Sequence, residues 1–285
     1  VDKRVVAIIP VVIDMLNIEP SFNHHKAAYG QYAEAVHDYV EMRIMDWMGK
    51  PEFAKLKRIE DPYEYRDRLT MPKFCLNSAG DQFFLPDSWQ FYWHDLKGPK
   101  HLRYVPNTGH SLNDSDAIDS LVAFYHAILN KTPLPRYEWA VEKTGAITVR
   151  AKDKPKEVRL WRATNPNARD FRIDKLGPKW SSTRLRPRAD GVYRATAARP
   201  PKGWTAAFIE LTNGDLDDLD LSSLEFKEKS WDPDFQASFM KAIRYRGGYT
   251  YIAWNNARPL FGDPRVRRAL TMLTDRQGMI DNLLF

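Results

Sequence analysis

The sequence of 285 residues predicts an α/β protein, followed by a small antiparallel β-sandwich and then a short α+β segment. Three observations support this order. Over residues 1–135, short apolar runs alternate with helical patterns, which is typical of a parallel sheet. Over residues 136–212 the apolar period becomes two, which is typical of antiparallel strands. After Thr212 the composition changes again, and acidic residues cluster over 215–220.

Three apolar runs predict the parallel strands. Residues 5–13 form a continuous and largely β-branched run, which predicts a strand buried on both faces of the sheet. Residues 73–77 and 101–105 predict two further strands. Because the carboxyl ends of parallel strands lie at one edge of a sheet, we expect the loops after these runs to lie close together.

Helical patterns separate these runs. Between residues 17 and 69, apolar residues recur at spacings of three and four, and Gly49-Lys50-Pro51 interrupts the pattern. Pro62 is well placed at the first position of another short helix. This stretch is too long for a simple crossover between strands, so we expect a helical insertion near the site.

Two more helices and a linker follow. Residues 86–96 are rich in aromatic residues and predict a helix whose Trp89 and Trp93 belong to the core rather than to a substrate pocket. A second helix is expected to end at Leu129, with Asp114 or Ser115 as its N-cap. The proline-containing residues 131–135 predict a linker to the sandwich.

Two short loops carry the chemistry. Residues 78–83 read Ser-Ala-Gly-Asp-Gln-Phe, and residues 106–111 read Pro-Asn-Thr-Gly-His-Ser. A strand that ends in Gly-Asp, followed about 30 residues later by one that ends in Gly-His, is how an α/β-hydrolase presents its acid and base. Asp81 would hold the imidazole of His110, and His110 would take the proton from a serine. Asp81 and His110 are therefore the candidate catalytic residues.

The nucleophile of such a site is missing from the sequence. An α/β-hydrolase serine precedes the acid in a sharp G-x-S-x-G turn, and no such turn precedes Asp81. Ser78 and Ser111 do not substitute for it, because neither lies on an elbow between a strand and a helix. The chain is therefore predicted to be inactive by itself.

The net charge of +6 is concentrated in one part of the chain. Residues 136–212 hold 18 lysine and arginine residues against 8 aspartate and glutamate residues. Such a surface is either a solvated β surface or a binding surface for anionic lipid or polysaccharide of a cell envelope. No RNA- or DNA-binding motif accompanies the charge, so nucleic acid is not expected as a partner.

Neither a metal nor another cofactor is expected. The single cysteine, Cys75, excludes an internal disulfide and Cys-rich metal sites. His24 and His25 are adjacent and point in different directions on a helix, so they are predicted to be surface histidines. The apolar runs are far shorter than the ~20 residues of a membrane span, and no signal peptide begins the chain.

Residues 1–212 resemble the PhoPQ-activated pathogenicity-related family. The matching stretches are residues 4–17, 78–88, 105–110, 169–172 and 203–206. The resemblance implies a secreted or periplasmic protein with an α/β-hydrolase fold and a β-rich module after it. It also implies a nucleophile in a segment before the first strand, so the chain is read as truncated at its N-terminus.

Residues 213–285 resemble part of another family, the family 5 periplasmic solute-binding proteins that capture peptides or nickel for ABC importers. The matching stretches are residues 251–255, 259–270 and 275–277. The resemblance implies that the helix with Arg267 and Arg268 is structural. In this family Trp254 would face a peptide cleft, which is not expected to form without the other lobe. The chain is thus predicted to be chimeric, with a junction near residues 211–214 and a last segment that folds separately.

Together these observations predict three parts. They are the C-terminal part of an α/β-hydrolase domain (1–135), a β-sandwich module (136–212) and a solute-binding-protein fragment (213–285). The leading hypothesis is a hydrolase of the Ser-His-Asp type for an ester, amide or peptide, with its acid and base kept. The alternatives are a non-catalytic envelope protein that binds through the basic sandwich, and capture of a peptide or other solute by the last segment.

Overall fold

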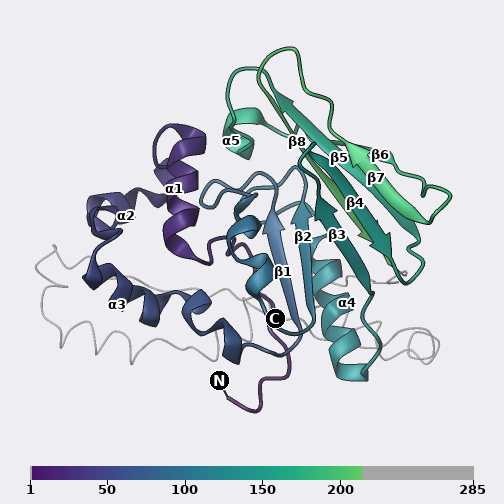
Figure 1. Ribbon diagram of the computed structural model, residues 1–285, viewed down its shortest axis with the longest axis horizontal. Coiled ribbons are helices and arrows are strands. Elements are labelled where there is room, and N and C mark those ends of the chain that lie inside the picture. The colour runs from purple at the N-terminus through teal and green to yellow at the C-terminus, as the bar shows by residue number, and fades with distance from the viewer. Residues whose placement is uncertain (1, 214–285) are drawn as a thin grey trace, which may run out of the picture. The chain divides into compact units, whose positions relative to one another are not determined.

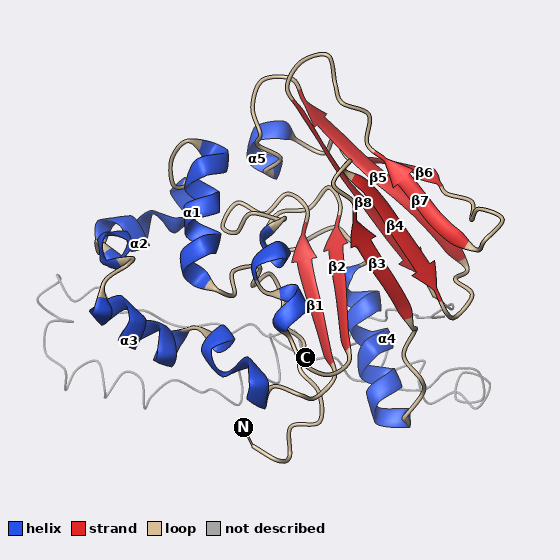
Figure 2. Cartoon of the chain, in the orientation of Figure 1, coloured by secondary structure: helices blue, strands red, loops and turns tan. Residues whose placement is uncertain are grey.

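The computed structural model describes residues 2–213 (Figure 1, Figure 2). The chain divides into two compact units, Val1–Leu216 and Asp217–Phe285. The strand expected over 249–255 and the helix expected over 263–273 lie outside the described residues. The first unit combines a parallel sheet with helices and a set of antiparallel strands over residues 136–212, called the β module below.

The centre of the first unit is a parallel pair of strands. β1 (Lys73–Ser78) and β2 (Lys100–Val105) pair in parallel, with Lys73 opposite Lys100 and Ser78 opposite Val105. Both arrows point the same way in Figure 1, so the loops after them begin at one edge of the sheet. The two strands expected in these places, and their parallel arrangement, are confirmed.

The run over residues 5–13 lies beside β1 but does not form a regular strand. Its backbone bonds to β1 and to Pro72 through Ile8, Pro10 and Val12, in the parallel direction. Pro10 has no N–H to donate, so the ladder is interrupted in its middle. The expected burial of this run on both faces is wrong, because Val6 is 66% exposed. In the described part of the chain, the run lies at the outer edge of the sheet.

Alternation along β1 builds two cores, one on each face of the sheet. Phe74 and Leu76 face α4 (Ala117–Asn130) and pack against Phe124. Cys75 points to the opposite face, where it packs against an aromatic cluster around Trp93. This two-residue period is the ordinary consequence of strand geometry.

The stretch over 17–69 is a helical insertion, as expected. Its elements are α1 (Ile18–Tyr29), η1 (Glu34–Val36), α2 (His37–Glu41), η2 (Ile44–Trp47), α3 (Pro51–Glu60) and η3 (Pro62–Arg68). Pro51 and Pro62 each begin a helix, where the missing N–H costs nothing. Asp61 caps η3, because its side chain accepts a hydrogen bond from the amide of Tyr63.

The helix expected over 86–96 is wrong in its form. The segment folds into two short 3₁₀ helices, η4 (Ser88–Phe91) and η5 (Trp93–Asp95). Tertiary packing decides the shape, since Tyr92 and Trp93 are buried against β1. The expectation that the aromatic residues of this segment form core is confirmed for these two.

The expected N-cap of α4 is wrong, because the N-cap position is Asp116, whose side chain makes no capping hydrogen bond. Ser115 lies one residue earlier, and its Oγ accepts a local hydrogen bond of 3.3 Å from the amide of Ala117. None of the helices in residues 2–213 has the length and apolar character needed to cross a lipid bilayer.

The β module consists of antiparallel strands, as its two-residue period predicts. Its strands are β3 (Tyr137–Val141), β4 (Ala146–Ala151), β5 (Glu157–Asn165), β6 (Ser181–Arg184), β7 (Val192–Thr196) and β8 (Trp204–Thr212). They form two three-stranded sheets of order β3-β4-β7 and β6-β5-β8. A short helix, α5 (Ile173–Leu176), lies in the connection between β5 and β6.

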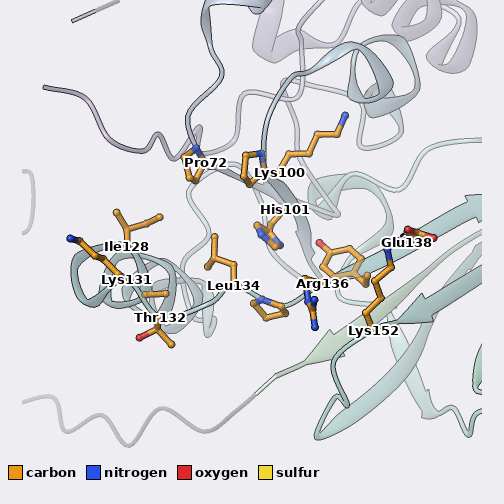
Figure 3. A pocket seen from close by; sticks show the side chains of 14 residues that line it. Pro72, Lys100, His101, Ile128, Lys131, Thr132, Leu134, Arg136, Glu138 and Lys152 are labelled. Carbon is orange, nitrogen blue, oxygen red and sulfur yellow. Dashed lines mark ion pairs between the residues drawn. The ribbon is translucent and has the colours of Figure 1, made fainter. Parts of the chain in front are cut away.

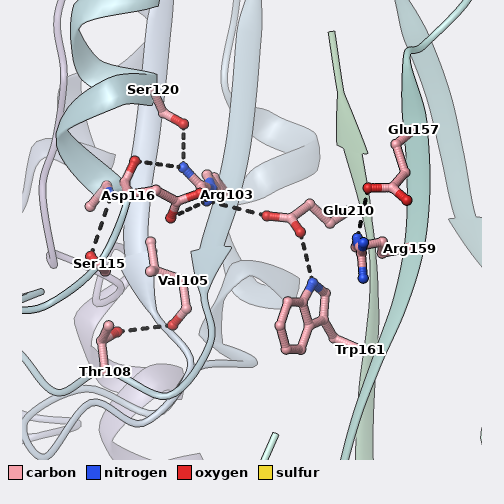
Figure 4. Close-up of polar contacts among 11 residues, drawn as sticks. Arg103, Val105, Thr108, Ser115, Asp116, Ser120, Glu157, Arg159, Trp161 and Glu210 are labelled. Atoms are coloured by element: carbon pink, nitrogen blue, oxygen red, sulfur yellow. Dashed lines mark hydrogen bonds and ion pairs between the residues drawn. The ribbon is translucent and has the colours of Figure 1, made fainter. Parts of the chain in front are cut away.

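A polar network joins the parallel sheet to the β module (Figure 4). Arg103 of β2 donates to both carboxylate oxygens of Asp116, at 2.7 and 2.8 Å, and to Glu210 of β8 at 3.3 Å. The other oxygen of Glu210 accepts a hydrogen bond from the indole of Trp161 on β5. The side chains of Arg103 and Glu210 are only 14% and 16% exposed, so this ion pair is shielded from water.

We expect Arg103→Met to lower the free energy of unfolding by about 3 kcal/mol, because it leaves the largely buried carboxylate of Glu210 without its cation. Arg4→Met is the matched control, since Arg4 pairs with Asp2 on an exposed surface, where such pairs contribute little. Urea unfolding followed by tryptophan fluorescence measures both. Equal effects of the two substitutions would show that the Arg103 network does not hold the β module in place.

Candidate functional site

The two expected catalytic residues lie in the loops that follow β1 and β2. Asp81 comes three residues after the end of β1, and His110 comes five residues after the end of β2. Because the strands are parallel, the two loops lie at the same edge of the sheet. α5 lies on this side too, and the amide of Ile173 donates a hydrogen bond to the carbonyl of Gly80 (Figure 1).

The structure brings Asp81 and His110 into direct contact. Nδ1 of His110 lies 3.0 Å from Oδ2 and 3.1 Å from Oδ1 of Asp81. The hydrogen bond that the sequence predicts between these side chains is therefore present. With Nδ1–H donating to the carboxylate, Nε2 is left as the nitrogen that can accept a proton, which is the orientation of a general base.

Local backbone contacts hold the carboxylate of Asp81 in place. Its Oδ1 accepts hydrogen bonds from the amides of Phe83, at 2.7 Å, and Phe84, at 3.2 Å. The residue is 2% exposed, and this burial raises the pKa of its carboxyl, while the amide of Phe83 and the charge of His110 lower it. Asp81 can thus orient and stabilise an imidazolium without contact with bulk water.

The imidazole of His110 is held by its own neighbours. The backbone amide of His110 donates to Oε1 of Gln82 at 2.9 Å. The ring of Phe83 lies 4.3 Å from the imidazole, centroid to centroid, and that of Phe84 lies 5.9 Å away. The side chain of His110 is still about one-third exposed.

Ser78 has a structural role between the two loops. Its buried hydroxyl donates to the carbonyl of Thr108 at 2.7 Å and accepts from the amide of Gly80 at 3.0 Å. A Cβ on Gly80 would lie 2.5 Å from that same carbonyl oxygen, so only glycine allows this close approach. Within residues 2–213, no hydroxyl is hydrogen-bonded to Nε2 of His110, and Ser111 is exposed.

A second histidine–carboxylate pair, which was missed in the sequence, joins α1 to the loop after β1. Nε2 of His24 lies 2.9 Å from Oδ1 of Asp87, and Arg169 of the β module donates to the other oxygen of Asp87. Asp87 comes six residues after Asp81 in the same loop. A signal was present in the sequence, since Asp87 and Arg169 both belong to stretches that match the first family.

The prediction that His25 lies at the surface is wrong. His25 is 2% exposed, and its Nε2 accepts a hydrogen bond of 3.0 Å from the amide of Ala33. Burial, and then the charge of Arg172, lowers its pKa to about 4. His25 lies on the apolar face of α1 together with Phe22 and Tyr29, at helical spacings of three and four. This spacing is the sequence signal that could have predicted its burial.

A buried carboxyl group near the site was also missed. Asp14 follows the 5–13 run and is 2% exposed. Its two oxygens accept hydrogen bonds from the phenols of Tyr92, at 2.6 Å, and of Tyr104, at 2.5 Å. Burial, together with the nearby charges of Asp87 and Asp81 and partly offset by these hydrogen bonds, raises the pKa of Asp14 to about 8. In the described part of the chain, no three His, Cys, Asp or Glu side chains are arranged to hold a metal ion.

The sequence matches two protein families. Residues 1–172 match the family described as PhoPQ-activated pathogenicity-related protein. Residues 199–285 match the middle part of the bacterial extracellular solute-binding proteins of family 5. This second match begins ahead of Asn213, where the resemblance was expected to start. It includes β8, which pairs along its whole length with β5.

A curated relative extends the first match. Autocrine proliferation repressor protein A of Dictyostelium discoideum is 36% identical to the chain over 232 residues. The alignment covers 74% of the chain and 47% of the relative, so the chain spans about half the length of the relative. The family match covers more than half of the chain, and both findings agree with the residues that carry the resemblance. The chain therefore belongs to the PhoPQ-activated pathogenicity-related protein family.

Proposed function

We propose that residues 1–135 carry the acid and base of a hydrolase of α/β-hydrolase fold and Ser-His-Asp type. The observation that supports this is the 3.0 Å contact between Nδ1 of His110 and Oδ2 of Asp81 at the carboxyl edge of a parallel sheet. The reaction class is acyl transfer from an ester, amide or peptide to water. His110 would accept the proton of the nucleophile through Nε2 and return it to the leaving group, while Asp81 stabilises the imidazolium.

A covalent step of this reaction needs a serine Oγ at Nε2 of His110. Among residues 2–213, no hydroxyl is hydrogen-bonded to that nitrogen. We therefore propose that the chain by itself does not form an acyl-enzyme. We also propose that the chain has three parts, with boundaries at 135/136 and 212/213. Its proposed location is periplasmic or secreted.

The protonation of His110 tests the role of the pair. Nitrogen NMR on ¹⁵N-histidine-labelled chain should show His110 with its proton on Nδ1 and a bare Nε2. Asp81→Asn should move the neutral ring towards the Nε2–H tautomer, since the carboxylate that selects Nδ1–H is lost. Asp87→Asn is the matched control, and it should change His24 but leave His110 as it is. A wild-type His110 that carries its proton on Nε2 would contradict the proposed base.

A fluorophosphonate probe tests the second part of the proposal. The purified 285-residue chain should not be labelled, and His110→Ala should look the same as wild type. A known serine hydrolase in the same tube serves as the positive control. Labelling of wild type that is lost in His110→Ala would mean that a serine outside residues 2–213 reaches Nε2. The chain would then be a competent hydrolase, and the proposed inactivity would be wrong.

A second candidate is a non-catalytic binding role. It is favoured by the name of the Dictyostelium relative, which describes an autocrine repressor of proliferation, and by the basic charge of residues 136–212. Salt-dependent binding of the chain to anionic lipid or polysaccharide would support it. The match over residues 199–285 favours capture of a small molecule or peptide by that segment, and this too is a proposal.

A further inference from the structure

A cavity of about 600 Å³ lies at the edge of the sheet opposite to Asp81 and His110 (Figure 3). It is lined by the start of β2, the end of α4, the connection over 131–136 and the first residues of β3. The size is in the range of small-molecule sites. None of the features used above for the hydrolase proposal lines this cavity.

One wall of the cavity is apolar and rigid. Ile128 of α4 and Leu134 of the connection present side chains to it, and both also pack against the core between the sheet and α4. Pro72 and Pro99 contribute backbone of restricted freedom. An apolar ligand would find this wall already formed, so little ordering would be needed on binding.

The charged groups around the cavity are mostly basic. Lys131 forms no ion pair with a carboxylate in the described part of the chain. Arg136 binds Asp153 through Nε and Nη2, which leaves Nη1 without a partner among residues 2–213. The one acidic lining residue, Glu138, is already paired with Lys152 at 2.5 Å.

The side chains of Lys100 and His101, which also line the cavity, do not oppose an anion. Lys100 directs its ammonium away from the cavity, where it donates to the carbonyls of Trp93 and Leu96 (Figure 3). The ring of His101 lies between the rings of Tyr137, at 5.7 Å, and Phe124, at 6.4 Å. Burial lowers the pKa of His101, so at neutral pH its imidazole is uncharged and adds to the apolar side of the cavity.

We propose that this cavity binds a monoanionic carboxylate with an apolar body, such as a medium-chain fatty acid. The apolar part would lie against Ile128 and Leu134. The carboxylate would lie at the solvent side, where Nη1 of Arg136 is free to donate, and Lys131 would add positive charge at the rim. A guanidinium N–H suits a carboxylate, since burying a charge is favourable only when it is paired.

Binding of sodium decanoate to the complete 285-residue chain tests the proposal. Isothermal titration and amide NMR shifts should place the ligand at residues 128–137. Decanol and decyltrimethylammonium should bind at least about 10-fold more weakly, and added salt should weaken decanoate binding. Binding that does not distinguish decanoate from decanol would overturn the assigned charge recognition. Binding of inorganic phosphate in place of decanoate would overturn the assigned apolar part.

Two variants test the position of the ligand. Lys131→Gln should weaken decanoate binding about 5-fold, whereas the matched control Lys143→Gln, on the exposed turn between β3 and β4, should leave it unchanged. Thr132→Trp should fill the opening and abolish binding, and because Thr132 is exposed this change should not affect folding. Unchanged binding by both Lys131→Gln and Thr132→Trp would show that the ligand lies elsewhere.

Discussion

Asp14→Asn should make the free energy of unfolding of the first unit much less dependent on pH between about 4 and 8. In the wild type, this free energy should fall as the pH rises through that range. The pKa of Asp14 is raised to about 8 in the folded protein, whereas an unfolded aspartate titrates near pH 4. In this interval the folded state holds a proton that the unfolded state releases. The stabilisation is therefore complete below about pH 4 and is lost as the pH rises through 8.

The expected size of this effect is large for one residue. Each unit of pKa difference corresponds to ~1.4 kcal/mol, so the full interval corresponds to on the order of 5 kcal/mol. An asparagine keeps the shape of the side chain and has no proton to lose. Asp81 is also buried with a raised pKa, so a smaller slope should persist in the variant.

Urea unfolding at several pH values between 4 and 8.5 measures the effect. The matched control is Asp38→Asn, which changes an exposed carboxylate on α2 and should leave the wild-type pH dependence in place. If Asp14→Asn and wild type lose stability in parallel across this range, Asp14 is ionised in the folded protein at neutral pH. The phenols of Tyr92 and Tyr104 would then compensate for its burial.

Trp93→Ala should lower the free energy of unfolding by about 4 kcal/mol. The indole is buried against Cys75 and Leu96 on the face of the sheet away from α4. Deleting such a ring removes its transfer free energy and leaves a cavity that the rigid strand cannot collapse into. The ammonium of Lys100, which lies 5.1 Å from the ring centroid, would lose a favourable contact as well.

Trp47→Ala provides the control with the same chemical change. Trp47 is 45% exposed at the end of η2, so its loss should cost well under half as much. Thermal and urea unfolding of both variants give the comparison. An effect of Trp93→Ala as small as that of Trp47→Ala would mean that the segment over 86–96 is not part of the core. The alternative interpretation, that its aromatic residues line a substrate pocket, would then be favoured.

The sequence alone determined the local features whose causes are local. The apolar run over 73–77, the period of two over 157–161 and the proline at the first position of η3 are properties of the backbone and of single side chains. The pairing of Asp81 with His110 was also predictable. A parallel sheet has one carboxyl edge, and the Gly-Asp and Gly-His loops both follow strands that end there.

Only the tertiary structure decided the rest. Pro10 interrupts the ladder of the 5–13 run, and the segment over 86–96 bends into 3₁₀ turns because its rings must reach β1. Asp14, His25 and Glu210 look like ordinary polar residues in the sequence. Each is buried or shielded because its partner lies far along the chain or on another element, as Tyr104 does for Asp14. Pairings of this kind depend on which surfaces meet in three dimensions, and a pattern of neighbouring residues does not contain that information.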